Sequence, residues 1–339
     1  MPSTPTAVAS GKPQSTPTAQ PQASRPVLKR LTEPGCCSGV WWSADGTAVL
    51  FVDKPDERDA AIWGVDAVSN DRAPYSFLVG ILQHNDRYII VPQHRTPQSV
   101  TLHDRETGES WGLIDVGLLP FIAPDGTQLA YDGRSTHLPR SINRRQAPIV
   151  VADLDGSNPR FLNSIYGGGI IDWFPDGSRL LVVGTLTEGR QLPALWLVDV
   201  ATGAIEKLVD SAFMRNISLS PDGAWVAFLT LFEEDTALNT TWAVNVHTGE
   251  RRRLNFVGAY AWVEAEGNTL VYVPARDAPD AGFAVWKLNV ATGERIGLVD
   301  PKQTPLFIAN GDWALAPDGQ RLAFVSAKDY AIWLLELNP

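Results

Sequence analysis

The stretch Ile217–Leu229, with the sequence ISLSPDGAWVAFL, decides the fold of this chain. A short apolar segment leads into Pro221-Asp222-Gly223, and a second apolar segment, Trp225–Leu229, follows at once. Asp-Gly between two such segments is a strong β-hairpin signal, because a tight turn needs residues that tolerate positive φ. The stretch therefore predicts two antiparallel strands joined by a short turn.

The same turn signal between two apolar segments recurs along the chain and indicates a repeat protein. The first residues of successive turns are separated by 40, 40, 51, 46, 44 and 52 residues, the period of a four-stranded propeller blade. In the second unit His84-Asn85-Asp86-Arg87 replaces the Pro-Asp-Gly motif, but Tyr88–Val91 still follows as the expected second strand. The turns are Asp45-Gly46, Asn85-Asp86, Asp125-Gly126, Asp176-Gly177, Asp222-Gly223, Glu266-Gly267 and Asp318-Gly319.

Each unit has a recognisable second half. In five units a tryptophan stands three residues before an Asp, Asn or Glu, and in most units a Thr-Gly or Asp-Gly turn and a further apolar segment such as Ile205–Val209 follow. We therefore expect strand, Asp-Gly turn, strand, longer loop, strand, second turn, strand. The tryptophans are Trp63, Trp196, Trp242, Trp286 and Trp333.

This pattern predicts an all-β fold, a single β-propeller of seven four-stranded blades over residues 26–339. Neighbouring blades would cover the two apolar faces of each sheet, whereas a parallel β-solenoid has shorter rungs and needs no paired hairpin turns. Residues 1–25 are rich in Pro, Ser and Thr and are expected to be a disordered tail or spacer. The last unit lacks a fourth strand after Ile332–Leu337, and Val27–Leu31 resembles it. Pairing of these ends would close the ring.

Charge and cysteine content narrow the function. The 339-residue chain has a formal net charge of -10, which argues against nucleic-acid partners, and no apolar run reaches the ~20 residues of a transmembrane segment. Cys36 and Cys37 are adjacent, with Cα atoms about 3.8 Å apart, below the usual disulfide range of ~4.4–6.8 Å. We expect two ordinary thiols, and a redox-responsive pair is the other interpretation.

The Pro-Asp-Gly repeats resemble those of the TolB-like β-propeller family. They stand at Ala123–Gly126, Phe174–Gly177, Ser220–Gly223 and Ala316–Gly319. The resemblance implies a bacterial protein of the cell envelope, periplasmic or extracellular, that binds other proteins; a cytoplasmic location stays open because no signal peptide is present. The chain departs from the family in two ways, since it has seven units where the envelope protein that names the family has six blades, and it lacks the G-x-S-x-G of the peptidase members.

Sites on propellers usually lie at a channel mouth, so the loops that follow the second and fourth strands are the candidates. The loop 132–147 gathers positive charge in an acidic protein, and the glycine-rich loop 164–171 contains Tyr166. Cys36 and Cys37 belong to the same face. We expect a protein or a small anionic ligand to bind there. The basic loop contains Arg134, His137, Arg140, Arg144 and Arg145.

Catalytic and metal signals are sparse. Asp172 and Asp312, each directly before a tryptophan and a first strand, are the candidate carboxylates of an enzyme. The five histidines lack metal-ligand spacing, and the calcium-like run from Asp153 has Ser164 where the loop requires Glu. We expect neither a metal nor a cofactor.

These features favour a non-enzymatic binding or protein-interaction propeller. The alternative is a channel-mouth enzyme of the lyase, glycoside-cleaving or cyclase type. Such an enzyme would need carboxylates, His or Tyr that converge on one mouth with shifted pKa values.

Overall fold

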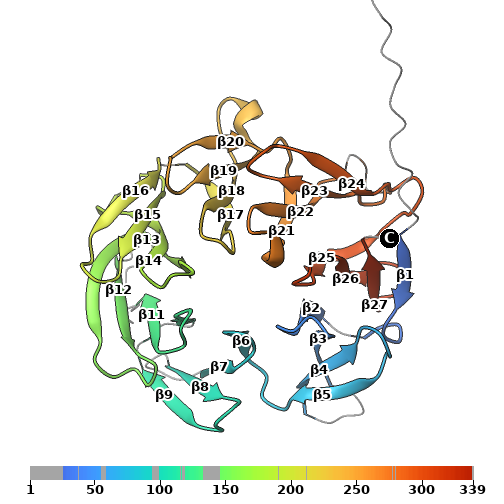
Figure 1. The fold of residues 1–339 in the computed structure, drawn as a ribbon, viewed down its shortest axis with the longest axis horizontal. Helices are drawn as coiled ribbons and strands as arrows, with labels where there is room; N and C mark the ends of the chain where they lie inside the picture. The colour runs from blue at the N-terminus through green and yellow to red at the C-terminus, as the bar shows by residue number, and fades with distance from the viewer. Residues whose placement is uncertain are drawn as a thin grey trace, which may run out of the picture.

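The chain folds as an all-β propeller. The computed structural model describes residues 26–36, 38–54, 59–93, 99–114, 116, 119–132, 146–189, 191–210, 212–276, 278 and 280–337. Within these ranges the structure is built from strands and two short 3₁₀ helices, η3 (Thr236–Leu238) and η4 (Glu264–Glu266). The sheets are arranged around a common axis (Figure 1). No helix in the described ranges has the length and apolar character to cross a membrane.

Five of the sheets contain four antiparallel strands each, as the repeats predict. Four of these five are formed by consecutive strands of one unit. They are β2 (Ser38–Trp42), β3 (Ala48–Asp53), β4 (Ala61–Asp66) and β5 (Arg72–Ser76); β6 (Ile81–Gln83), β7 (Tyr88–Gln93), β8 (Ser99–Asp104) and β9 (Ser110–Ile114); β17 (Met214–Leu219), β18 (Trp225–Thr230), β19 (Thr241–Asn245) and β20 (Arg251–Arg253); β21 (Gly258–Trp262), β22 (Thr269–Pro274), β23 (Val285–Asn289) and β24 (Arg295–Val299).

The fifth sheet joins the two ends of the chain. Its order is β1-β27-β26-β25, with β1 (Val27–Arg30), β25 (Ile308–Leu315), β26 (Arg321–Ser326) and β27 (Ile332–Glu336). Val27 lies opposite Glu336 and Arg30 opposite Trp333. The predicted pairing of the two ends is therefore confirmed over Val27–Arg30, and β1 lies beside β27 in Figure 1.

The third and fourth units are not separate sheets, which corrects the expectation of seven distinct four-stranded sheets. They form one seven-stranded sheet in which a 14-residue strand, β13, pairs with β12 and with β14. The predicted loop 164–171 lies within β13. The strands are β10 (Phe121–Ile122), β11 (Gln128–Asp132), β12 (Gln146–Asp153), β13 (Arg160–Trp173), β14 (Arg179–Thr185), β15 (Ala194–Asp199) and β16 (Ile205–Val209).

Glycines explain why β13 continues where a loop was expected. The register of β13 against β14 shifts between Tyr166 and Gly169, and Gly167 has a φ of 66°. A Cβ at Gly168 would lie 1.7 Å from the Val183 carbonyl oxygen, so only glycine lets the two backbones approach there. The sequence predicts a loop at Gly167–Gly169, whereas in the structure these glycines accommodate an irregular strand pairing.

The Asp-Gly turns are closed by hydrogen bonds to the side chains of their own aspartates. Asp222 Oδ1 accepts hydrogen bonds from Ser220 Oγ, at 2.6 Å, and from the Ala224 backbone N–H, at 3.0 Å, while Gly223 has a φ of 70°. The Asp and Asn residues after the third strands act alike, and Asp104 Oδ1 accepts the N–H groups of Glu106 and Thr107. The spacing of these residues, which repeats from unit to unit, therefore specifies turns and not a ligand-binding site.

The second unit uses a different turn. Arg87 donates its backbone N–H to the His84 carbonyl oxygen, and the two central residues, Asn85 and Asp86, have φ values of 52° and 60°. This is the two-residue hairpin with positive φ at both centres, which fits the twist of antiparallel strands. The missing Pro-Asp-Gly motif thus reflects a shorter turn, not a lost strand.

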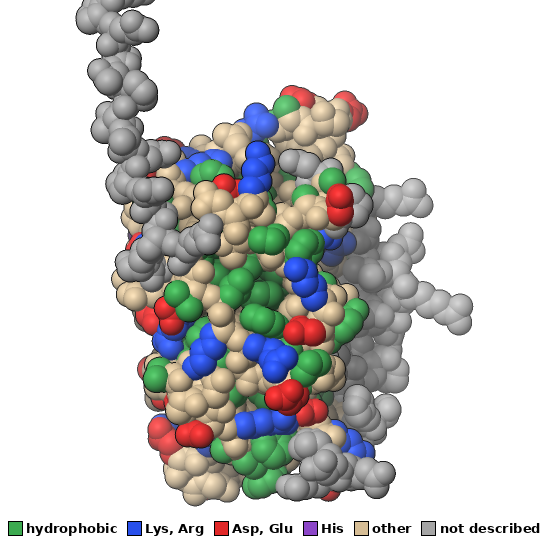
Figure 2. All heavy atoms as spheres, turned by 90° about the vertical axis from the view of Figure 1, so that its right-hand side faces the viewer, with side chains coloured by type: hydrophobic (Ala, Val, Ile, Leu, Met, Phe, Trp, Pro, Cys, Tyr) green, Lys and Arg blue, Asp and Glu red, His purple; other side chains and the backbone are tan. Residues whose placement is uncertain are grey.

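Apolar clusters between neighbouring sheets form the core. One cluster joins Val49 and Phe51 of β3 to Ala323 and Val325 of β26, which links the first unit to the last. The repeated tryptophans of the third strands are only partly buried, and Trp196 Nε1 donates to the Gly184 carbonyl of its own sheet. On the side of the ring that Figure 2 shows, charged side chains of both signs alternate with hydrophobic ones.

Candidate functional site

All five basic residues proposed from the sequence lie outside the described residues. These are Arg134, His137, Arg140, Arg144 and Arg145, together with Cys37. Of the two segments of the proposed mouth, 133–145 lie outside the described residues and 164–171 is part of β13, so a ligand site at this mouth stays a prediction.

Cys36 and Tyr166 lie in different units of the ring. Cys36 is disulfide-bonded, which differs from the expectation of an ordinary thiol; the sequence contains one other cysteine, Cys37. The Sγ atom of Cys36 lies 4.0 Å from Asp53 Oδ2, and the residue packs against the apolar cluster between the first and last sheets. Tyr166 instead lies in the middle of β13, opposite Gln146 and Thr185.

The two candidate aspartates occupy different registers. Asp172 is three residues before Pro175, whereas Asp312 is five residues before Pro317, so Asp312 lies about 7 Å further from its turn along β25. Asp172 lines a pocket and Asp312 is not among the residues of that pocket. The structure therefore does not bring the pair together.

The pocket that contains Asp172 lies where three strands end at the hairpin-turn face. Asp172 and Trp173 lie at the end of β13 and form one side of the pocket. The residues of the other side lie at the ends of β17 and β21 or directly after them, and these are the inner strands of their sheets in Figure 1. Its volume is about 520 Å³. We call it the inner-strand pocket, and its lining is Asp172, Trp173, Pro175, Leu219, Ser220, Pro221, Trp262 and Glu264.

Both carboxyl groups of this pocket have raised pKa values. Loss of bulk water raises the pKa of Asp172, although its side chain is accessible to solvent; the Trp173 backbone N–H, 2.8 Å from Oδ1, opposes this in part. Such a combination fits a carboxylate on the wall of a recess. Desolvation alone raises the pKa of Glu264, although its side chain too is accessible to solvent, and the described part of the chain offers its carboxylate no hydrogen-bond or ion-pair partner.

The two indoles of the pocket are fixed by their neighbours. Trp173 Nε1 donates to the Phe121 carbonyl oxygen at 2.9 Å, and Trp262 Nε1 donates to Ser218 Oγ at 2.9 Å. Each bond reaches another unit, so the indoles are positioned by the closed ring. The pocket thus combines rigid aromatic surfaces with two carboxyl groups that bind protons more readily than in water.

Sequence reasoning missed Glu264 and Trp262. The sixth unit has Val263-Glu264-Ala265-Glu266-Gly267 where other units have the Pro-Asp-Gly motif, and η4 forms there. The glutamate directly before a degenerate turn was a sequence signal that could have identified Glu264. The convergence of three units on one pocket could not be predicted from the sequence, because it depends on closure of the ring.

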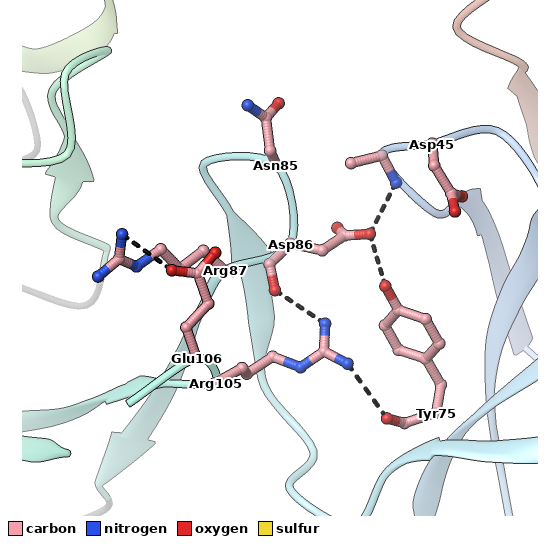
Figure 3. A pocket seen from close by; sticks show the side chains of 8 residues that line it. Asp45, Tyr75, Asn85, Asp86, Arg87, Arg105 and Glu106 are labelled. Carbon is pink, nitrogen blue, oxygen red and sulfur yellow. Dashed lines mark hydrogen bonds and ion pairs between the residues drawn. The ribbon is translucent and has the colours of Figure 1, made fainter. Parts of the chain in front are cut away.

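A larger pocket, of about 570 Å³, lies between the sheets of the first and second units (Figure 3). Asp86 Oδ2 accepts hydrogen bonds from Tyr75 Oη and from the Ala44 backbone N–H, at 2.8 and 2.7 Å. Arg105 donates to the Asp86 and Tyr75 carbonyl oxygens and lies over the Tyr75 ring, 4.3 Å from its centroid. The hydrogen-bonding groups named here bond to one another, so the residues of this pocket connect the two sheets and we do not assign a ligand to it.

Comparison with known proteins identifies the fold and not the family. No protein-family model and no curated protein matches the chain. The chain is similar to an oligogalacturonate lyase in complex with manganese, with a TM-score of 0.66 and 15% identity over 91% of this chain and 92% of that chain. It is also similar to an oligogalacturonate lyase from Vibrio parahaemolyticus, with a TM-score of 0.65 and 16% identity over 94% of both chains. TolB from Acinetobacter baumannii matches with a TM-score of 0.46 and 18% identity, over 82% of this chain and 76% of that one.

The donors that the structure describes do not fit a resident manganese ion. Among the described residues no group of three or more His, Cys, Asp or Glu side chains could hold a metal ion. The inner-strand pocket supplies two carboxyl groups and, within its described lining, no histidine. The chemistry available there is proton transfer by carboxyl groups.

Proposed function

We propose that this chain is a channel-mouth enzyme that cleaves glycosidic bonds in the inner-strand pocket. The observation that carries the proposal is that Asp172 and Glu264, both with pKa values raised by desolvation, line the same pocket. This convergence is the feature that separates an enzyme from a binding propeller. The volume of about 520 Å³ suits a small sugar segment.

The two carboxyl groups are suited to different roles. Glu264 has no partner among the described residues that stabilises its charge, so it is the general acid that protonates the leaving-group oxygen. Asp172 holds one oxygen on the Trp173 N–H and keeps the other available, so it activates the water that attacks the anomeric carbon, or attacks that carbon itself. In either case water supplies the hydroxyl group of the product and the proton that restores the acid.

The charge of the pocket lining favours one class of substrate. The described lining contains two carboxyl groups and no Lys or Arg. A uronate chain would place its own carboxylates against these groups and would be repelled at neutral pH. We therefore propose a neutral or amino sugar substrate, unlike the oligogalacturonate that the similar structures are named for.

Release of reducing sugar from short neutral, amino and uronate oligosaccharides tests this function. Asp172→Asn and Glu264→Gln are each expected to lower kcat by ~100-fold or more, because each removes a proton-transfer group. The matched control is Asp312→Asn, an inner-strand carboxylate outside the pocket, which should leave kcat unchanged. Preference for uronates, or full activity of both variants, would contradict the proposal. Sugar binding without cleavage would assign the pocket to binding alone.

We also infer that the ring has seven blades, with β13 serving two of them. Its first half supplies the outer strand of the third blade and its second half the inner strand of the fourth, in line with pairing to β12 and to β14. Membership of the TolB-like family and location in the cell envelope remain predictions from the repeats.

A further inference from the structure

An exposed phenylalanine stands in an unfavourable backbone conformation on the loop between β18 and β19. The side chain of Phe232 is 80% exposed, and its φ is 63°. The left-handed region disfavours any residue with a Cβ atom, and a bulky residue there is unusual. Strain of this kind persists only where the surroundings impose it, and it clusters at sites of function.

The loop that presents Phe232 is tightly held. Asn239 Oδ1 accepts the Glu233 N–H at 2.9 Å, and Asn239 Nδ2 donates to the Glu233 carbonyl oxygen at 3.4 Å. Trp242 Nε1 donates to Thr230 Oγ1 at 3.0 Å below it. The exposure of Phe232 is thus built into the fold.

An apolar pocket of about 260 Å³ lies beside this loop. Its floor is Val209, Ala212, Phe228, Leu238 and Trp242. The rings of Phe213 and Phe232 meet edge to face with centroids 5.6 Å apart, and Phe213 is itself 43% exposed. We call Phe213, Phe232, Leu238 and this pocket the Phe232 patch.

The rim of the Phe232 patch is acidic. Glu233, Glu234 and Asp235 follow Phe232 directly, and Glu233 lines the pocket. Asp210 and Arg251 also line the pocket, and Asp210 lies within ion-pair distance of both Arg251 and Lys207, so these two cations are paired with that single carboxylate. The three loop carboxylates therefore leave a net negative field around an apolar recess.

We propose that the Phe232 patch docks a segment of a partner polypeptide that carries one or two apolar side chains flanked by Lys or Arg. The pocket is smaller than the roughly 300–1,000 Å³ of most small-molecule sites and suits a side-chain anchor. The acidic rim selects basic flanks and disfavours an anionic lipid surface. The patch lies at the end of β18 opposite the Asp222 turn, so it is separate from the inner-strand pocket.

Fluorescence anisotropy with a labelled synthetic peptide tests this inference. The probe has a central Leu-Phe pair flanked on both sides by arginines; one control peptide has alanines at the centre, and another has glutamates at the flanks. The arginine peptide is expected to bind, and both controls at least ~10-fold more weakly. Raising salt from about 20 to about 200 mM should weaken binding, because the rim charges are screened.

Variants separate docking from folding. Phe232→Gly relieves the left-handed strain, so it should raise Tm by about 1–3 °C while weakening peptide binding at least ~10-fold. Phe77→Ala, an equally exposed phenylalanine on another loop, is the matched control and should change neither. Equal affinity for the glutamate peptide, full affinity of Phe232→Gly, no peptide binding, or binding only to phosphatidylserine vesicles would each overturn the inference.

Discussion

Desolvation of Asp172 at the pocket raises the pKa of its carboxyl group and, for the same reason, lowers the stability of the folded chain at neutral pH. Its pKa in the folded chain lies above 3.8 because of desolvation. Below pH 3.8 the carboxyl is protonated in both the folded and unfolded chains, so it costs no stability. As pH rises through the folded pKa, the unfolded chain ionises more readily, and stability is lost.

Asp172→Asn should therefore stabilise the protein at neutral pH. We expect Tm to rise by about 1–2 °C near pH 7 and to stay unchanged near pH 2.5, well below 3.8, where the wild-type carboxyl is protonated in both the folded and the unfolded chain. Thermal unfolding followed by circular dichroism at both pH values measures this difference.

Asp104→Asn provides the opposite sign as a control. Arg87, 2.8 Å away, and two backbone N–H groups lower the pKa of Asp104 to about 2. Its stabilisation is present above pH 3.8 and is lost as pH falls through about 2, so this variant should lower stability near pH 7 by about 2 kcal/mol. If the two variants shifted Tm in the same direction near pH 7, the assigned pKa directions would be wrong.

Among the elements, the β6–β7 hairpin places three consecutive residues with a Cβ atom, His84, Asn85 and Asp86, at positive φ. Asn85 and Asp86 are both left-handed, and Asp86 also bonds to Ala44 and Tyr75 of the first unit (Figure 3). The positive φ of the turn therefore favours glycine at position 86, whereas the hydrogen bonds to the first unit require the Asp86 carboxylate.

Asn85→Gly and Asp86→Gly should have opposite effects on stability. Asn85→Gly removes strain without removing a contact, and we expect a gain of about 0.5–1 kcal/mol in urea unfolding. Asp86→Gly relieves the same strain but leaves Tyr75 Oη and the Ala44 N–H without their acceptor, so we expect a net loss of about 1–2 kcal/mol. A gain from both substitutions would show that the joint between these sheets contributes little.

The elements also show how far sequence reasoning reaches. Hairpins and their spacing were predicted because turn chemistry is local: Asp222 caps its own turn with groups two residues away. Gly168 was misread because its role depends on the Val183 carbonyl of another strand. Asp172 was named from the sequence and Glu264 was not, and Asp172 was expected directly before a first strand but lies at the end of β13, beside the hairpin turn. The ring that brings the two carboxyl groups to one pocket is a long-range property.

For the whole molecule, β1 is the closing element. Leu31 donates its N–H to the Ile332 carbonyl, Ile332 donates to Thr32 Oγ1, and Lys29 Nζ reaches the Val68 carbonyl of the first sheet. The strand thus completes the last sheet and contacts the first.

Two truncations test this closure. Deletion of residues 1–24 should leave Tm nearly unchanged, because it removes no described contact. Deletion of residues 1–32 should lower Tm clearly, since it removes β1 and exposes the edge of β27. Equal melting temperatures for the two truncations would rule out closure by β1.

The central claim is that the inner-strand pocket binds and cleaves a sugar between Glu264 and Asp172. A crystal structure of the Glu264→Gln variant, soaked with a short neutral oligosaccharide that the wild type cleaves, tests it most directly. We predict an intact sugar in the pocket, with a ring against Trp262, the glycosidic oxygen within hydrogen-bond distance of position 264 and Asp172 beside the anomeric carbon. A sugar bound at the opposite face of the ring, or in the pocket but out of reach of both positions, would contradict the claim.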